Sequence, residues 1–283
     1  MIYAGAMTLS HRNLCFKTGI AGCALSMILV IVSAFHLLPA FSAVLEESAV
    51  RSPGIFQSLA GNLLEPSPYV PLAAIFGSAI YALAGIIMIY IFFEKTQSPE
   101  ILFVSFFIIS LAFESVRLML PFMKQMYLSN SYLITSYRIL IFGRYFGLFS
   151  LLTSSICTSG YKIQKEQSAV FIIAMASLII AMGVPVDALD WDSAMNLLSG
   201  HGAVMLMIEW SVLGITIASF FISAYTRGSK SYFYIGLGAL LIYLGRNLLL
   251  NSDTWITPVP ALVMLSLGTW FICSKFHSIY LWL

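Results

Sequence analysis

Eight apolar runs follow one another along this 283-residue chain, and each is about 20 residues long, enough to cross a bilayer as a helix. Hydrocarbon offers the backbone no hydrogen-bond partners, so a run of this length has to form its hydrogen bonds within itself. The pattern predicts an all-α, polytopic membrane bundle of about eight transmembrane helices. The expected spans are Thr18–Leu38, Leu72–Phe93, Ile101–Met123, Tyr132–Cys157, Ala169–Val186, Gly202–Tyr225, Phe233–Leu250 and Trp255–Cys273.

The composition agrees with this class and excludes an ordinary soluble domain. Hydrophobic residues make up 60% of the chain and charged residues 9%, whereas a soluble domain carries about 25% charged residues. The links between runs are short, so we expect a single membrane domain over 1–283, with the lipid bilayer as its surroundings. The net charge of +2 with scattered basic residues gives no reason to expect a nucleic-acid partner.

Basic residues in the links predict the orientation, because cytoplasmic loops carry an excess of lysine and arginine. With the amino terminus inside, only Arg51 and Lys124 fall outside. Both the amino and the carboxyl terminus are then cytoplasmic. We expect an integral protein of a bacterial inner membrane or of another cellular membrane. The basic residues that this orientation places inside are Arg12, Lys17, Lys95, Lys162, Lys165, Arg227, Lys230 and Lys275.

The longest link is expected to be an outer loop over 39–70. Within it, Ser52 and Pro53 form a good helix start, and apolar residues recur after them at helical spacing. A short helix lying on the membrane surface is predicted there, acting as a lid or as a packing element. The basic head and the small residues 40–43 leave cleavage of the first span open, although its apolar run exceeds the usual core of about 7 to 15 residues in a signal sequence.

Six charged residues interrupt the predicted spans. Insertion scales assign each a cost of about 2.5 to 3.5 kcal/mol at the centre of a spanning helix, so retained charges mark a role. At about 1.5 Å per residue, Arg117 lies near the outer surface and Arg144 near the midplane, with His201 and Asn247 in the same outer half. The other four share one layer about 10 Å below the outer boundary: Glu114, Arg138, Glu209 and Arg246.

The spacing of these residues predicts some of their pairing. Glu114 and Arg117 are three residues apart and share a helix face, so they can pair within the helix. Arg138 and Arg144 are six apart, on different faces, and we expect different partners for them. Glu209 is the expected partner of Arg246 or Arg138.

A small-residue step in the fourth span predicts close helix packing. Gly143 and Gly147 form a GxxxG pattern, which lets a neighbouring helix approach closely beside Arg144.

The charges within the spans do not balance, since four arginines face two glutamates. Guanidinium groups bind phosphate or carboxylate through two parallel hydrogen bonds. We therefore predict an outward-facing, net-cationic pocket that binds an anionic small molecule or a lipid headgroup. The alternative is a set of structural ion pairs between helices. The candidate ligand-binding residues are Glu114, Arg117, Arg138, Arg144, His201, Glu209, Arg246 and Asn247.

Three function classes fit such a pocket. A receptor or sensor needs a separate cytoplasmic signalling partner, because the chain carries no soluble output module. A transporter of an anionic or amphipathic solute needs a cavity that opens to each side in turn. An enzyme acting on a lipid phosphate would use Glu114 or Glu209 as acid or base and His201 as helper. No cofactor is expected, since the chain has no HExxH, CxxC or GxGxxG motif and no phosphate-binding loop.

Overall fold

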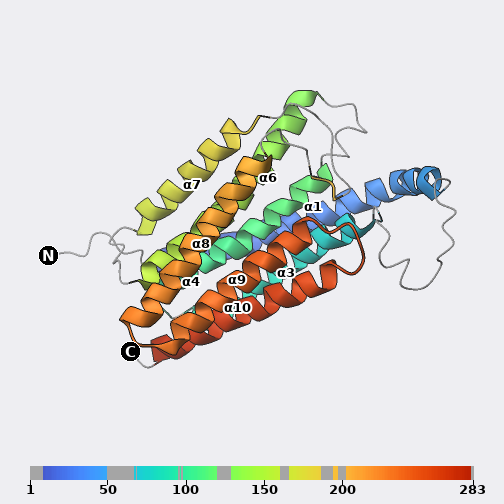
Figure 1. The fold of residues 1–283 in the computed structure, drawn as a ribbon. Helices are drawn as coiled ribbons and strands as arrows, with labels where there is room; N and C mark the ends of the chain where they lie inside the picture. The colour runs from blue at the N-terminus through green and yellow to red at the C-terminus, as the bar shows by residue number, and fades with distance from the viewer. Residues whose placement is uncertain are drawn as a thin grey trace.

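The computed structural model describes residues 9–49, 67, 69–94, 96, 98–119, 129–159, 166–185, 194–196 and 202–281, with the side chains of 37–49 and 281 left out of the description. These residues form helices, short turns and no strands. Eight helices are long and apolar enough to cross a membrane, which confirms the predicted multi-pass bundle. They run side by side in Figure 1.

The helix bounds agree with the predicted spans to within a few residues at most ends. The third span begins as α4 and continues through the 3-10 turn η1 into a helical stretch over 116–119. The elements are α1 (Leu9–Ala49), α3 (Tyr69–Phe93), α4 (Pro99–Ser110), η1 (Leu111–Ser115), α6 (Asn130–Thr158), α7 (Glu166–Gly183), α8 (Gly202–Thr226), α9 (Lys230–Leu250) and α10 (Pro258–Leu281).

Two serines begin helices by binding backbone N–H groups that have no partner within the helix. The Ser98 hydroxyl accepts from the N–H of Ile101 at 3.4 Å, and proline follows at the first position of α4. The Ser229 hydroxyl accepts from Ser231 at 3.4 Å at the start of α9. These caps fix where α4 and α9 enter the bundle.

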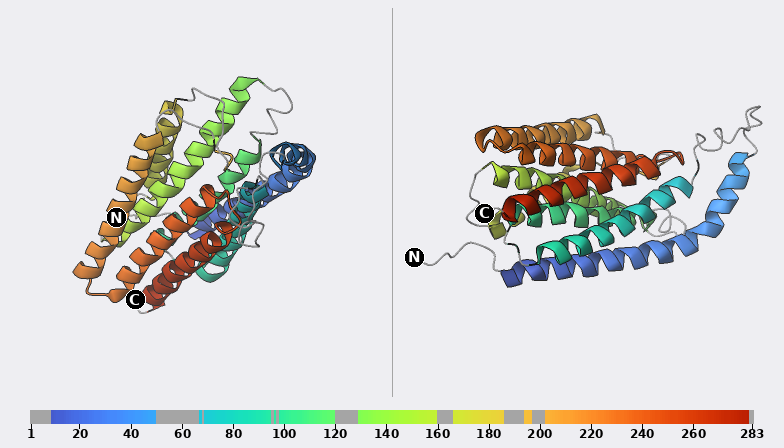
Figure 2. Two further views of the ribbon diagram at one scale, coloured as in Figure 1. Left: turned by 45° about the vertical axis from the view of Figure 1, so that its right-hand side comes forward. Right: turned by 90° about the horizontal axis from the view of Figure 1, so that it is seen from below.

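The helices differ in how deeply they lie within the bundle. The most apolar stretch of the span over 99–119 is 78% buried, compared with 17% in α7 and 22% in α8. In the views of Figures 1 and 2, α7 and α8 lie on the outside and α4 runs between other helices. The third span, which carries Glu114 and Arg117, is therefore the centre of the bundle.

One end of the bundle gathers the start of α1 and the ends of α3 and α10. Arg12 Nη2 on α1 donates to the carbonyl oxygens of Phe93 at 3.2 Å and Glu94 at 3.3 Å. The Phe93 ring meets His277 of α10 edge to face, with ring centroids 5.9 Å apart. The start of the first helix and the end of the last helix thus lie at the same end of the bundle, as an even number of spans requires (Figure 2). The assignment of this end to the cytoplasm stays a prediction.

The prediction of an outer loop over 39–70 is wrong at its start. The helix α1 continues to Ala49, so 39–49 are helical. Pro39 did not end the helix. A proline inside a helix removes one hydrogen bond and bends it, and α1 bends near its far end in Figure 2. The predicted surface helix after Pro53 lies outside the described residues.

The eighth span also starts later than predicted. Its helix begins at Pro258 rather than at Trp255, because proline fits the first turn of a helix, where its missing N–H would have no partner.

Candidate functional site

The 3-10 turn η1 positions the central carboxylate. It interrupts the third span at Leu111–Ser115. Serine hydroxyls just before it and at its last residue donate to the carbonyl oxygen three residues earlier, Ser110 Oγ to Phe107 O at 2.6 Å and Ser115 Oγ to Ala112 O at 2.8 Å. A 3-10 segment inside a longer helix often marks a functional position. Here it carries Glu114, which is only 2% exposed.

Glu114 and Arg144 form a two-bond ion pair between η1 and α6. Arg144 Nε donates to Glu114 Oε1 at 2.9 Å, and Arg144 Nη2 donates to Glu114 Oε2 at 3.0 Å. Parallel charge-assisted bonds of this kind are the strongest that a guanidinium makes with a carboxylate. The pair fixes the orientation of both side chains.

Glu114 also pairs with Arg117, as the three-residue spacing predicts. Arg117 Nη1 lies 3.4 Å from Glu114 Oε2. Arg117 Nη2 donates to the carbonyl oxygen of Leu250 at 3.1 Å and to that of Ala194. Arg117 is 1% exposed, and it joins the third span to the end of α9.

Asn196 completes this network, and sequence reasoning missed it. Its Oδ1 accepts from Arg144 Nη2 at 2.7 Å, while its Nδ2 donates to Leu250 O at 3.2 Å. The preceding residue, Met195, has φ 59°, a left-handed conformation that is uncommon outside glycine. No apolar periodicity marks such a loop residue, so the sequence carried no signal for it.

Arg246 on α9 lies beside this network without a carboxylate of its own. Its Nη2 donates to the backbone oxygen of Arg144 at 3.3 Å. Its Nη1 is buried and has no hydrogen-bond partner within the described chain, where Arg246 also takes part in no ion pair. Since the side chain is 2% exposed, water compensates little of this charge.

Glu209 on α8 differs from the expectation. It accepts from the Tyr243 hydroxyl at 3.2 Å, and among the described residues it forms no ion pair with Arg246 or Arg138. Tyr243 stands three residues before Arg246 on α9, and its hydroxyl binds Glu209 where a guanidinium was predicted. Asn247 lies within hydrogen-bonding reach of the same hydroxyl.

Arg138 is not part of this network among the described residues. Arg138 Nε is buried and has no hydrogen-bond partner in the described structure, and its guanidinium does not share Glu114 with Arg144. No partner of Arg138 is described, so a separate partner for each of the two arginines of α6 stays a prediction. His201 lies outside the described residues.

The predicted GxxxG step explains how α6 comes so close to the third span. A Cβ built at Gly143 would lie 2.5 Å from Phe113 Cβ, and one built at Gly147 would overlap the Ser110 hydroxyl. Only glycine permits this approach. The two glycines thus bring Arg144 within reach of Glu114.

The arginine cluster comprises Glu114, Arg117, Arg144, Asn196 and Arg246, and three of these residues are deeply buried. Glu114, Arg117 and Arg246 are each at most 2% exposed, and three cavities found in the structure lie away from them, beside α3 and α10, at the α8–α9 turn, and beside α1 and Trp255. The predicted outward-facing pocket is not seen among the described residues, and it stays a prediction. Within the described residues no group of His, Cys, Asp and Glu is placed to hold a metal ion.

The chain is similar to an uncharacterized protein of Treponema pallidum (strain Nichols). The two are 22% identical, and the match covers 84% of this chain and 81% of that protein. No family model matches the sequence, and no solved structure matches it. The conclusion that these comparisons and the geometry support together is a multi-pass membrane protein with a buried, arginine-rich cluster.

Proposed function

We propose that this membrane protein binds an anionic group, the phosphate or carboxylate of a small molecule or of a lipid headgroup, at Arg246, and that it acts as a receptor or sensor. The observation that supports the proposal is the Nη1 atom of Arg246, which is buried and has no partner in the described chain. An isolated buried charge is costly. A bound anion would remove that cost.

The charge balance of the contacting residues supports the same proposal. Arg117 and Arg144 share one carboxylate, Glu114, and Arg246 adds a third guanidinium next to them. Glu209 and Arg138 carry opposite charges, so including them in the count leaves the excess of positive charge unchanged. Carboxylates and phosphates match the planar fork of a guanidinium, so they are the expected ligands.

The helices that the cluster joins support the proposed signalling role. Glu114, Arg144 and Arg246 come from three different spans, and Leu250 O receives bonds from Arg117 and Asn196. An anion at Arg246 would draw this guanidinium away from the Arg144 backbone and so change how α9 sits against α6. Such a shift is the kind of helix movement that transmits binding to the far side of a membrane.

The test measures anion binding by the purified protein in neutral detergent. The probes are inorganic phosphate and phosphatidylglycerol, with phosphatidylcholine as the lipid without net charge, and the readouts are thermal stabilisation and native mass spectrometry. We expect Arg246→Gln to weaken binding about tenfold to a hundredfold, the equivalent of one charge-assisted bond of about 1.5 to 3 kcal/mol. Stabilisation by phosphatidylglycerol alone would identify a lipid headgroup, and stabilisation by phosphate would identify a free anion.

The matched control is Arg227→Gln. Arg227 is exposed in the turn between α8 and α9, where its Nη1 donates to the Tyr232 hydroxyl at 2.7 Å, far along α9 from Arg246. This variant removes the same charge and should bind like the unmodified protein. Equal losses in both variants, or equal binding of phosphatidylglycerol and phosphatidylcholine in the absence of any response to phosphate, would refute the anion site.

A further inference from the structure

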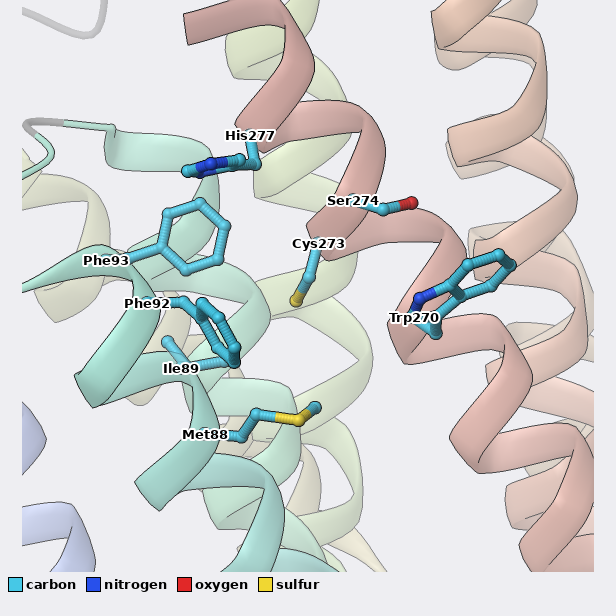
Figure 3. A pocket seen from close by; sticks show the side chains of 8 residues that line it. All are labelled: Met88, Ile89, Phe92, Phe93, Trp270, Cys273, Ser274 and His277. Carbon is cyan, nitrogen blue, oxygen red and sulfur yellow. The ribbon is translucent and has the colours of Figure 1, made fainter. Parts of the chain in front are cut away.

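A separate cavity lies between α3 and α10, near the end of the bundle where α1 begins. Its volume is about 240 Å³. Figure 3 shows Met88 and Phe92 of α3 on one side and Trp270 and Cys273 of α10 on the other. None of the arginine-cluster residues lines it.

The cavity is open toward the outer surface of the bundle. Three of its wall residues are large, apolar and partly exposed: Phe92 at 63%, Trp270 at 58% and Met88 at 39%. All three lie within helices that are apolar enough to span a bilayer. Hydrocarbon therefore surrounds the opening.

Polar groups gather at one end of the cavity only. Ser274 and His277 lie one turn apart on α10, beyond Cys273 and toward the end of that helix. The His277 ring packs edge to face on Phe93, which fixes its position at the wall. The cavity is thus apolar along its length and polar at the end nearest the membrane surface.

The size and surroundings restrict the occupant. The volume is below the range of about 300 to 1,000 Å³ typical of sites for drug-sized ligands. A peptide segment is a poor occupant, because its backbone groups would find few hydrogen-bond partners in an apolar wall open to hydrocarbon. A segment of a single unbranched hydrocarbon chain satisfies both limits, because it is narrow and has no hydrogen-bonding groups.

We propose that this cavity binds one hydrocarbon chain of a membrane lipid, with the polar head of that lipid beside Ser274 and His277. The bound chain packs between Phe92 and Trp270, and the lipid's polar atoms exchange hydrogen bonds with the imidazole. The site is independent of the anion site proposed at Arg246.

The test uses a long-chain monoacylglycerol that carries a photoreactive diazirine in its chain, bound to the purified full chain in neutral detergent. This probe is uncharged, so the arginine cluster does not contribute to its binding. After illumination, mass spectrometry of the peptides locates the adducts. We expect adducts on 88–93 and 270–277 that excess unlabelled monoacylglycerol abolishes. Adducts spread over all exposed helices, with no competition, would refute the site.

A pair of matched variants separates the cavity from the general lipid surface. Ser274→Trp places a large ring in the cavity, while Ser211→Trp places the same ring on an exposed face of α8, and both serines donate to a carbonyl of their own helix. We expect Ser274→Trp to lose the competed adducts and Ser211→Trp to keep them. Thermal unfolding of both variants checks that they are folded.

A second pair of variants keeps the proposal testable if Ser274→Trp does not fold. Phe92→Ala removes one wall of the cavity, and Phe171→Ala removes an equally exposed ring from α7, since the two are 63% and 62% exposed. The competed adducts should fall in Phe92→Ala only. Retention of the adducts in folded Phe92→Ala and Ser274→Trp would overturn the proposal.

Discussion

Arg144 Nε and Nη2 each donate one short hydrogen bond to a different oxygen of Glu114, at 2.9 and 3.0 Å, and so join α6 to the 3-10 turn of the third span. The carboxylate is 2% exposed. Removing one partner of a buried pair leaves an uncompensated charge, at a cost of about 3 to 5 kcal/mol. We therefore predict that Glu114→Gln lowers the midpoint of thermal unfolding more than any other single change in the cluster.

A charge-preserving substitution tests the geometry of this pair. Arg144→Lys keeps the positive charge, but a lysine ammonium cannot form the parallel two-bond arrangement or reach Asn196 in the same way. We expect a loss of stability between that of the unmodified protein and that of Arg144→Gln, measured by thermal unfolding in detergent. An Arg144→Lys protein as stable as the unmodified one would show that charge alone matters.

Replacing Arg246 is predicted to leave the unfolding temperature unchanged or to raise it, in contrast to replacing Glu114 or Arg144. Its buried Nη1 has no partner in the described residues, and an apolar side chain of similar volume would remove the cost of burying this charge. Arg246→Met should therefore unfold at the same or a higher temperature in the absence of anions. A destabilisation as large as that of Glu114→Gln would instead indicate a structural role for Arg246.

The close approach of α6 can be tested at its glycines. Gly147→Ala places a Cβ against the Ser110 hydroxyl, and such overpacking costs about 1 to 3 kcal/mol. Gly214→Ala is the control, because nothing lies within 4 Å of its Cβ position on α8. We expect that control to be neutral or to gain up to about 1 kcal/mol from the better helix propensity of alanine. Equal effects of the two substitutions on the unfolding temperature would contradict this packing.

The predicted orientation has its own test. Single cysteines in place of Lys230 and Asp253 lie at opposite ends of α9, on a background without the four native cysteines. With both termini cytoplasmic, a membrane-impermeant maleimide added to intact cells should label the cysteine at position 253 and not the one at 230. The reverse pattern would invert the topology.

The spans were predictable because the apolar runs are long and separated by polar links, a signal that needs no tertiary information. The Glu114–Arg117 pair was predictable from spacing within one helix. The Glu114–Arg144 pair was not, because the 3-10 turn rotates about 120° per residue instead of about 100°, which accumulates about 100° over its five residues. Depth and face estimates that assume a regular α-helix fail at that point.

Two residues that take part only through tertiary contacts could not be predicted from the sequence either. Asn196 lies in a short described stretch between α7 and α8 with no apolar pattern. Tyr243 reads as an ordinary aromatic residue of a span, although its hydroxyl binds Glu209 at 3.2 Å. The start of the predicted outer loop was misplaced because Pro39 was read as a helix end, whereas α1 bends and continues to Ala49.

The carbonyl oxygen of Leu250, the last residue of α9, accepts from both Arg117 and Asn196 at 3.1 and 3.2 Å. The last turn of a helix carries the negative end of its peptide dipoles, equivalent to about half an elementary charge. The main chain of α9 therefore supplies part of the counter-charge that the acidic side chains lack, and it does so at any pH. Protonating Glu114 would weaken the field that holds the arginines without abolishing it.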